Sequence, residues 1–161
     1  MADQYENTPF EALPEERQEL IKNFINGTID TVTVMQHEHR VSMINIANQT
    51  LESELRELDF EEFNCSSYDE FMYQIAVAAA YADNDFSEAD KESVDEIVKT
   101  LGLNEQLYDS ARNAEINLSE VSKKLKSVSR GMFFTLVSLV VLNDKQYSDD
   151  EYNLMLHILA P

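Results

Sequence analysis

Glycine and proline are scarce in this chain, and that scarcity constrains its fold more than any other feature. Only three residues of each kind occur among 161. Sheet proteins need turn residues at short intervals, whereas helices joined by short connections need few. A chain of this length suits one domain with a single core. The sequence therefore predicts an all-α fold, a single-domain helical bundle.

The charge of the chain is strongly acidic. There are 31 Asp and Glu residues against 12 Lys and Arg, which gives a formal net charge of −19. Such a surface repels phosphate backbones and anionic lipid, so nucleic acid and membrane surfaces are poor partners. Cations and basic protein patches are better ones. Solubility alone is the competing explanation for the charge.

The cysteine count and the apolar runs bear on location. Cys65 is the only cysteine, so no intrachain disulfide can form, and a reducing, cytoplasmic location fits. Residues 1–17 are acidic and lack the apolar segment of a signal peptide. The most apolar run, residues 132–142, is too short to span a bilayer and predicts a buried core helix. We therefore expect no direct membrane insertion.

Residues 1–65 predict N-terminal helices that pack on the core or extend it. Pro14 marks a helix start, and Gly27 predicts the end of that helix because glycine readily takes the left-handed conformation. One long helix is then expected from Thr28 to about Leu58. The β-branched residues at its start leave a short strand as the alternative. The apolar face of the first helix is formed by Leu20, Ile21, Phe24 and Ile25.

Residues 66–161 carry a regular series of helical patterns, which we expect to form the core of the domain. Ser67 and Ser87 precede two of these helices as N-caps, and Gly102 ends the second. The remaining helices are expected at about 104–114, 119–126 and 128–142, and from Asp149 to Leu159.

Two stretches of this part of the chain repeat one another. The sequence YADNDFSEADKESVDEIVKTL aligns with LNDKQYSDDEYNLMLHIL, with Asp83 matched to Asp144 at an offset of 61 residues (144 − 83). Each copy follows an apolar helix and precedes an amphipathic one. The internal repeat predicts two helix–loop–helix hairpins with their apolar first helices at the centre. The other matched pairs are Phe86 with Tyr147, Ser87 with Ser148, and Asp90 with Glu151.

Helix capping explains part of the acidity of the repeats. Ser87 with Asp90, and Ser148 with Glu151, have the spacing of a capping box, in which the serine and the acid each bond the other's backbone N–H. Acids in the first turn also interact favourably with the helix dipole. Capping does not explain the acids that precede the caps, which are Asp83, Asp85 and Asp144.

The unexplained acids suggest a site for a divalent cation. Asp83 and Asp85 alternate with Ser87, and oxygen ligands at alternate positions are typical of calcium loops. The loop is not an EF-hand, because its sixth and twelfth positions hold Glu88 and Val94 instead of Gly and Glu. A hard cation such as Ca²⁺, Mg²⁺ or Mn²⁺ would relieve the repulsion among clustered carboxylates. The predicted metal ligands are Asp83, Asp85, Asp90, Asp144 and Glu151.

Residues from about 68 to 160 resemble the TerB-like family, which is associated with bacterial tellurite resistance. The resemblance is carried by AVAAAYADNDFSEADKESVDEIVKTLGL and LVSLVVLNDKQYSDDEYNLMLHILA. In that family an apolar helix ends in Asp-Gly, and an acid seven residues later begins the next helix. Asp83 with Asp90, and Asp144 with Glu151, hold those positions here. The resemblance implies an all-helical, non-enzymatic stress-response protein in which the paired acids form a divalent-cation site.

The chain departs from the family pattern at three positions. Asn84 and Lys145 stand where the family has glycine, and Asp90 stands where it has Glu. Asparagine tolerates the left-handed conformation, so we expect the first loop to keep its shape. Lys145 adds a positive charge that competes with a cation at Asp144.

Three other features suggest chemistry but have simpler explanations. His37 and His39 lie two residues apart, so on a helix they point to different faces and do not readily share a metal. Cys65 has no basic neighbour in sequence to activate it as a nucleophile. The basic cluster in residues 122–130 is a solvated helix face, an internal counter-charge or a docking patch.

We expect no enzymatic activity, because no nucleophile–base pair can be assembled from these motifs. The alternative to a cation-responsive stress protein is a metal-free protein–protein interaction module. Such a module would present the long helix of residues 28–58 and the acidic surface to a protein partner or to a second copy of the chain.

Overall fold

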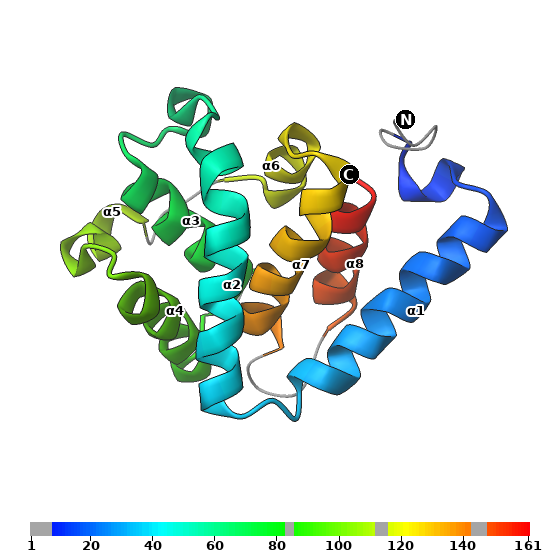
Figure 1. Ribbon diagram of the computed structural model, residues 1–161, viewed down its shortest axis with the longest axis horizontal. Helices are drawn as coiled ribbons and strands as arrows, with labels where there is room; N and C mark the ends of the chain where they lie inside the picture. The colour runs from blue at the N-terminus through cyan, green and yellow to red at the C-terminus, as the bar shows by residue number, and fades with distance from the viewer. Residues whose placement is uncertain (1–7, 83–85, 112–115, 143–147) are drawn as a thin grey trace.

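The computed structural model describes residues 8–82, 86–111, 116–142 and 148–161. Within these ranges every regular element is a helix, so the predicted all-α fold is confirmed (Figure 1). The elements in chain order are the 3-10 helix η1 (Phe10–Ala12), α1 (Glu15–Val32), α2 (His37–Arg56), the 3-10 helix η2 (Phe60–Phe63), α3 (Tyr68–Ala80), α4 (Glu88–Leu101), the 3-10 helix η3 (Glu105–Leu107), α5 (Tyr108–Ala111), α6 (Leu118–Lys124), α7 (Ser127–Val141) and α8 (Asp149–Leu159).

α7 is the central helix of the bundle. It packs against α1, α2, α3, α4 and α8. Its sequence is apolar on nearly all sides, as expected of a helix that is covered all round. Phe133, Phe134 and Leu139 have no accessible surface, so the predicted buried core helix over residues 132–142 is confirmed. Among the described residues, no helix has both the length and the apolar character needed to cross a membrane.

The other helices surround α7 in pairs. α3 packs against α4 as well as α7, and α8 packs against α6 and α1 as well as α7. α1 runs along one edge of the molecule and meets α2 only at the end where the two are joined (Figure 1). Helices from the N-terminal and C-terminal parts of the chain therefore share one core.

The prediction that a helix ends at Gly27 is wrong, because α1 continues to Val32. Gly27 lies in the helix interior and does not take a positive φ. Ile25 and Ile29 are buried on either side of it. Their burial stabilises the helix by more than the roughly 1 kcal/mol that glycine costs in a helix interior.

The single long helix expected from Thr28 to about Leu58 is also wrong. The chain turns at residues 33–36 and α2 begins at His37. An unbroken helix of that length would span about 46 Å, which exceeds the width of a small domain. The turn lets α1 and α2 both pack on α7. The strand alternative is wrong as well, because residues 28–32 are helical.

The elements after residue 66 follow their sequence signals closely. Ser67 caps α3 by accepting the backbone N–H of Glu70 at 3.2 Å. Gly102 ends α4 with a φ of +66°, the left-handed conformation expected of it. The helix expected at about 104–114 is broken in its described part into η3 and α5. Local capping signals therefore place most of these elements.

Candidate functional site

The two acidic helix starts are built as the sequence predicts. Ser87 Oγ accepts the Asp90 N–H at 3.2 Å, and Asp90 Oδ2 accepts the Ser87 N–H at 2.9 Å. At α8, Ser148 Oγ accepts the Glu151 N–H at 3.1 Å, and Glu151 Oε1 accepts the Ser148 N–H at 2.9 Å. Both capping boxes are confirmed, and α4 and α8 begin 61 residues apart (149 − 88).

These bonds give a structural role to two of the five predicted metal ligands. Asp90 and Glu151 each use a carboxylate oxygen to hold a helix start. Within the described ranges, no group of three or more His, Cys, Asp or Glu side chains is placed to hold a metal ion. The cation site therefore stays a prediction. The other residues of the acidic loops lie outside the described residues, and they are Asp83, Asn84, Asp85, Asp144, Lys145 and Tyr147.

Phe86, the residue before the first cap, is anchored on the core. It is partly buried there, which is the position expected of an apolar residue that precedes an N-cap. Its ring stacks on Tyr81 with the centroids 4.8 Å apart. Tyr81 follows α3 and Phe86 precedes α4, so this stack fixes the start of α4 relative to the end of α3.

The histidine cluster at the start of α2 contributes to an ion-pair site. His37 Nδ1 lies 2.9 Å from Glu96 Oε2, and Arg40 Nε lies 2.9 Å from Glu96 Oε1. Arg40 also donates to the Leu139 carbonyl in the last turn of α7, where the helix dipole favours a cation. These bonds tie α2 to α4 and α7. Sequence reasoning misses them because Arg40 and Glu96 are 56 residues apart and no local pattern links them.

A polar cavity of about 190 Å³ lies beside this ion pair. Its lining comes from the turn between α1 and α2, the first half of α4 and the residue after α7. Arg40 and Glu96 are nearly buried and pair with one another, and among the described lining residues Glu92 is the remaining charged side chain. The Arg40–Glu96 pair holds α2 and α4 together at this site.

Cys65 is a core residue with an unreactive thiol. It is buried, and its Sγ donates to Gln74 Oε1 at 3.2 Å. Burial, and to a lesser extent the negative charge of Glu70, raise the pKa of Cys65 to about 11. The side chain is therefore protonated at neutral pH, and only the thiolate is a strong nucleophile.

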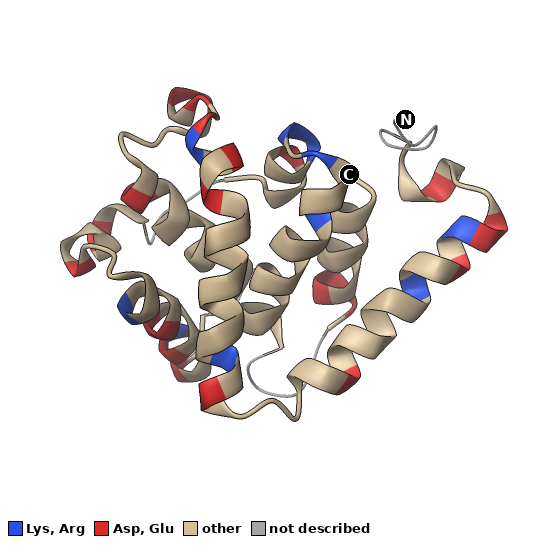
Figure 2. Ribbon diagram, in the orientation of Figure 1, with Lys and Arg blue, Asp and Glu red and all other residues tan. Residues whose placement is uncertain are grey.

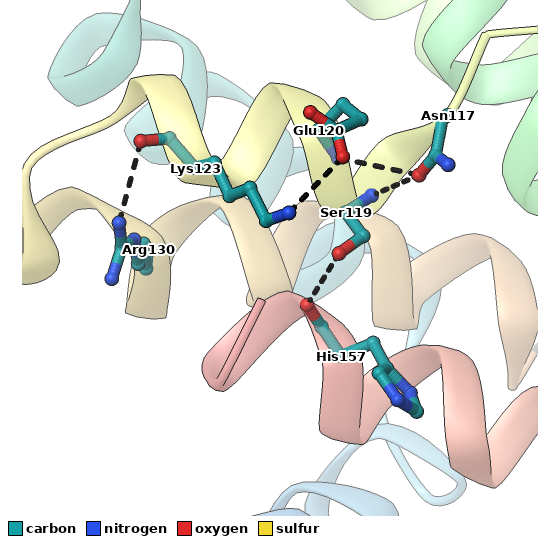
Figure 3. A network of polar contacts seen from close by, with 6 residues as sticks. All are labelled: Asn117, Ser119, Glu120, Lys123, Arg130 and His157. Atoms are coloured by element: carbon teal, nitrogen blue, oxygen red, sulfur yellow. Dashed lines mark hydrogen bonds and ion pairs between the residues drawn. The ribbon is translucent and has the colours of Figure 1, made fainter. Parts of the chain in front are cut away.

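The basic cluster of residues 122–130 is partly used inside the protein (Figure 3). Arg130 is buried and donates to the carbonyl oxygens of Ser122 at 2.9 Å and Lys123 at 3.4 Å. These carbonyls end α6, where the helix dipole favours a cation. Lys123 is exposed and pairs with Glu120 at 3.1 Å. Arg130 thus joins α7 to α6, whereas the lysines of the cluster lie at the surface.

The same region shows how α6 holds the end of α8 (Figure 3). Asn117 begins α6 by accepting the Ser119 N–H at 3.0 Å. Ser119 Oγ donates to the His157 carbonyl at 3.2 Å, and Ser122 Oγ donates to the Ile158 carbonyl at 2.5 Å. The last carbonyls of a helix lack partners within it, and these two hydroxyls supply them. These contacts hold the last turn of α8 against α6.

An apolar part of α1 faces solvent and borders a groove. Leu20 is 64% exposed and Phe24 is 50% exposed. Between them and the start of α7 the surface is hollowed by a cavity of about 340 Å³, whose lining includes Val128 and Leu159. The Phe24 ring contacts Phe134 of α7, with the centroids 5.4 Å apart. The sequence indicates that Leu20 and Phe24 share an apolar face, but nothing in it shows that this part of the face is left uncovered.

Acidic and basic residues both occur along α1 (Figure 2), and several of the acidic ones lie on one side of the apolar surface. Glu16 and Glu19 lie beside Leu20. Asp30 lies on the same side of the helix as Glu16, two heptads further along. Among the described residues, Glu16 and Asp30 form no ion pair, and Glu19 makes only an exposed 4.0 Å contact with Lys22. This edge of α1 therefore presents uncompensated negative charge.

Gly27 continues the apolar surface without a side chain. Apart from its two neighbours and the backbone of its own helix, a Cβ placed on it would meet no heavy atom of the described chain within 4 Å. Thr31 comes one turn later, and its hydroxyl donates to the Gly27 carbonyl at 2.9 Å. We refer to Leu20, Phe24, Gly27 and Thr31 together as the α1 ridge.

The acidic helix starts and the α1 ridge have to be interpreted from their own geometry. Comparison of the chain with models of protein families, with curated proteins and with solved structures gives no match.

Proposed function

We propose that this protein is a non-enzymatic interaction module that binds another protein through the α1 ridge. The observation that carries the proposal is the exposure of Leu20 and Phe24 beside a groove of about 340 Å³. Contiguous apolar surface rimmed by charged residues is typical of protein-binding sites. The proposal keeps the interaction module and acidic surface expected from the sequence, with α1 as the binding element in place of a helix over residues 28–58.

The energetics of α1 support this role. Only Ile25, Ile29 and Val32 of its 18 residues are buried. Full burial of a Leu or Phe side chain is worth about 1.5–3 kcal/mol, and the exposed positions Leu20 and Phe24 gain only part of it. A partner that covers both side chains would gain the remainder, and this gain would favour the complex.

Photo-crosslinking in the native cells tests the proposal. A photoreactive phenylalanine analogue at position 20 should give discrete products with another protein chain. The same group at position 46 is the control, because Ile46 is 45% exposed on α2, away from the ridge. Products that form from position 20 and not from position 46 would support the proposal. Equal products from both positions, or none from position 20, would contradict it.

We propose as a second candidate a TerB-like, cation-responsive role in stress response, of the tellurite-resistance type. Its support is that α4 and α8 carry the same capping box 61 residues apart (149 − 88), each packed against the apolar helix before it. Two repeated helix–loop–helix hairpins would have this arrangement. Ca²⁺, Mg²⁺ or Mn²⁺ would bind at the acidic loops, and the buried thiol of Cys65 suits a reducing cytoplasm.

Metal titration tests this second candidate. Calorimetry with each cation should give heat, and the melting temperature should rise, because a ligand that binds only the native state stabilises it. Asp83→Asn and Asp144→Asn should remove both effects. No heat and no rise in melting temperature at millimolar metal would contradict cation binding. That result would leave the α1 ridge proposal intact, since the two proposals depend on different helices.

A further inference from the structure

We infer that the partner of the α1 ridge is an amphipathic helix with Lys or Arg along one edge, packed lengthwise on the ridge. The inference rests on the proposed function and adds the chemistry of the partner. Three features of α1 carry it: the spacing of the ridge residues, the open space at Gly27, and the carboxylates along one side of the helix.

The α1 ridge has the spacing of a helix–helix seam. Its four residues, Leu20, Phe24, Gly27 and Thr31, follow at steps of four, three and four, which is the pattern that one helix presents to another in a coiled coil. The ridge is about 16 Å long, or roughly three helical turns. Thr31 suits such a seam because its hydroxyl already bonds the Gly27 carbonyl within α1.

Gly27 is the position where a partner helix can approach most closely. Its φ is not positive, so the backbone does not require glycine. Beyond its own helix turn, no heavy atom of the described chain lies within 4 Å of a Cβ built there, so the packing does not require glycine either. Glycine disfavours the helix that contains it. A second helix gives it a function, because a large apolar side chain of the partner can sit over the bare backbone.

The carboxylates on the outer edge of the ridge select a basic partner. Glu16 and Asp30 flank the seam on one side, and Glu19 lies further round the helix on the same side. Lys or Arg at the flanking positions of the partner helix would pair with them and set its orientation. The net charge of −19 attracts the same kind of partner from a distance.

A second copy of this chain fits the ridge poorly. An antiparallel pair of α1 helices centred on Phe24 brings Glu16 of one copy towards Asp30 of the other. That arrangement places like charges side by side, which is unfavourable. The same carboxylates disfavour nucleic acid and anionic lipid.

Designed peptides offered to the full chain test the inference. The probe is a fluorescent helical peptide of about five turns, with Leu at the seam positions and Lys at the flanking positions. One control peptide has the same residues in scrambled order, and the other has Glu in place of Lys. We expect the probe to bind at least about tenfold more tightly than either control in anisotropy titrations. The titrations are run at about 0.15 M salt, where long-range attraction is largely screened.

Variants of the protein separate binding at the ridge from folding. Gly27→Gln places a good helix former in open space, so it should melt at a higher temperature yet bind the probe at least about tenfold more weakly. Ile46→Gln, on α2, should bind within about twofold of the unchanged chain. The double variant Glu16→Lys with Asp30→Lys should bind the Lys peptide more weakly and the Glu peptide more tightly than the unchanged chain does. Glu105→Lys, an exposed control, should leave the preference for the Lys peptide intact.

Three results would each overturn the inference. The first is equal binding of the probe and its scrambled control, which would mean that net charge alone explains the binding. The second is full binding by Gly27→Gln, which would place the peptide elsewhere. The third is a dimer in sedimentation runs that Gly27→Gln dissociates, which would make the partner a second copy. The proposed function is tested separately, by the crosslinks from position 20 in cells. If those crosslinks form, the α1 ridge binds a protein even when the inferred chemistry of the partner is wrong. If they do not form, the proposed function itself fails.

Discussion

α7 and α1 are helices of similar length that relate to the rest of the chain in opposite ways. Ten of the 15 residues of α7 are buried, against three of the 18 in α1. α7 carries one charged residue, Arg130, whereas charges of both signs mark α1 (Figure 2). The buried residues of α7 are explained by its packing inside the bundle. The apolar residues that α1 exposes are not explained in that way, and the proposed partner would supply the missing contacts.

The two helices also begin differently. Glu54 of α2 accepts the Lys126 N–H at 2.5 Å and the Ser129 hydroxyl at 2.6 Å, so a distant carboxylate caps α7. α1 follows Pro14 and has no side-chain cap bond. Its first turn relies on acidic side chains to interact with the helix dipole. A carboxylate from another helix thus holds the start of α7, whereas the start of α1 follows a turn whose Phe10 and Leu13 are buried in the core.

The largest difference between the two helices is expected when a phenylalanine is truncated in each. Phe133→Ala should lower the free energy of unfolding by about 3–5 kcal/mol, because it opens a cavity in the core. Phe24→Ala should lower it by about 1 kcal/mol, because half of that side chain is already in water. Urea unfolding of both variants measures the contrast. Similar losses would mean that α1 is as well packed as α7, and the comparison would fail.

A smaller contrast is expected at the helix starts. Glu54→Ala should cost about 2 kcal/mol, since it removes two hydrogen bonds to a carboxylate and leaves the Lys126 N–H without that partner. Glu16→Ala on α1 should change the stability by less than about 0.5 kcal/mol, as an exposed residue without an ion pair to a described residue. Thermal unfolding of the pair checks this. A neutral Glu54→Ala would show that α7 does not depend on the cap from α2.

The parts of the fold that could be predicted are those set by neighbours in sequence. A capping box joins residues three apart, so the sequence predicts the starts of α4 and α8 from Ser87 with Asp90 and from Ser148 with Glu151. Gly102 predicts the end of α4, because the left-handed conformation that ends many helices favours glycine. Asp90 and Glu151, the two predicted metal ligands among the described residues, are the acids of these two capping boxes.

The parts that could not be predicted depend on residues far apart in sequence. The break between α1 and α2 has no glycine or proline at residues 33–36, and it is set by how both helices pack on α7. The bonds from Glu54 to Ser129 and from Arg40 to Glu96 span 75 and 56 residues. The exposure of Leu20 could not be predicted either. An apolar stripe shows which residues share a face of a helix, but not how much of that face other helices cover.

A small effect at Gly27 sharpens the comparison most, because its sign separates folding from binding. Gly27→Ala should raise the free energy of unfolding by about 1 kcal/mol, since alanine is the better helix former and meets no neighbour there. Gly102→Ala is the matched control and should lower it by about 1 kcal/mol, because its φ of +66° is unfavourable for alanine. Urea unfolding of both variants gives the two signs.

A loss of stability from Gly27→Ala would mean that the described fold itself needs glycine at this position, which would remove one support for a partner helix on α1. A gain would mean that the chain keeps a residue that weakens its own helix. In α7 the buried residues are explained by the stability of the fold. At Gly27 the fold would then be more stable with another residue, and the close approach of a second helix is the physical reason that remains for a glycine there.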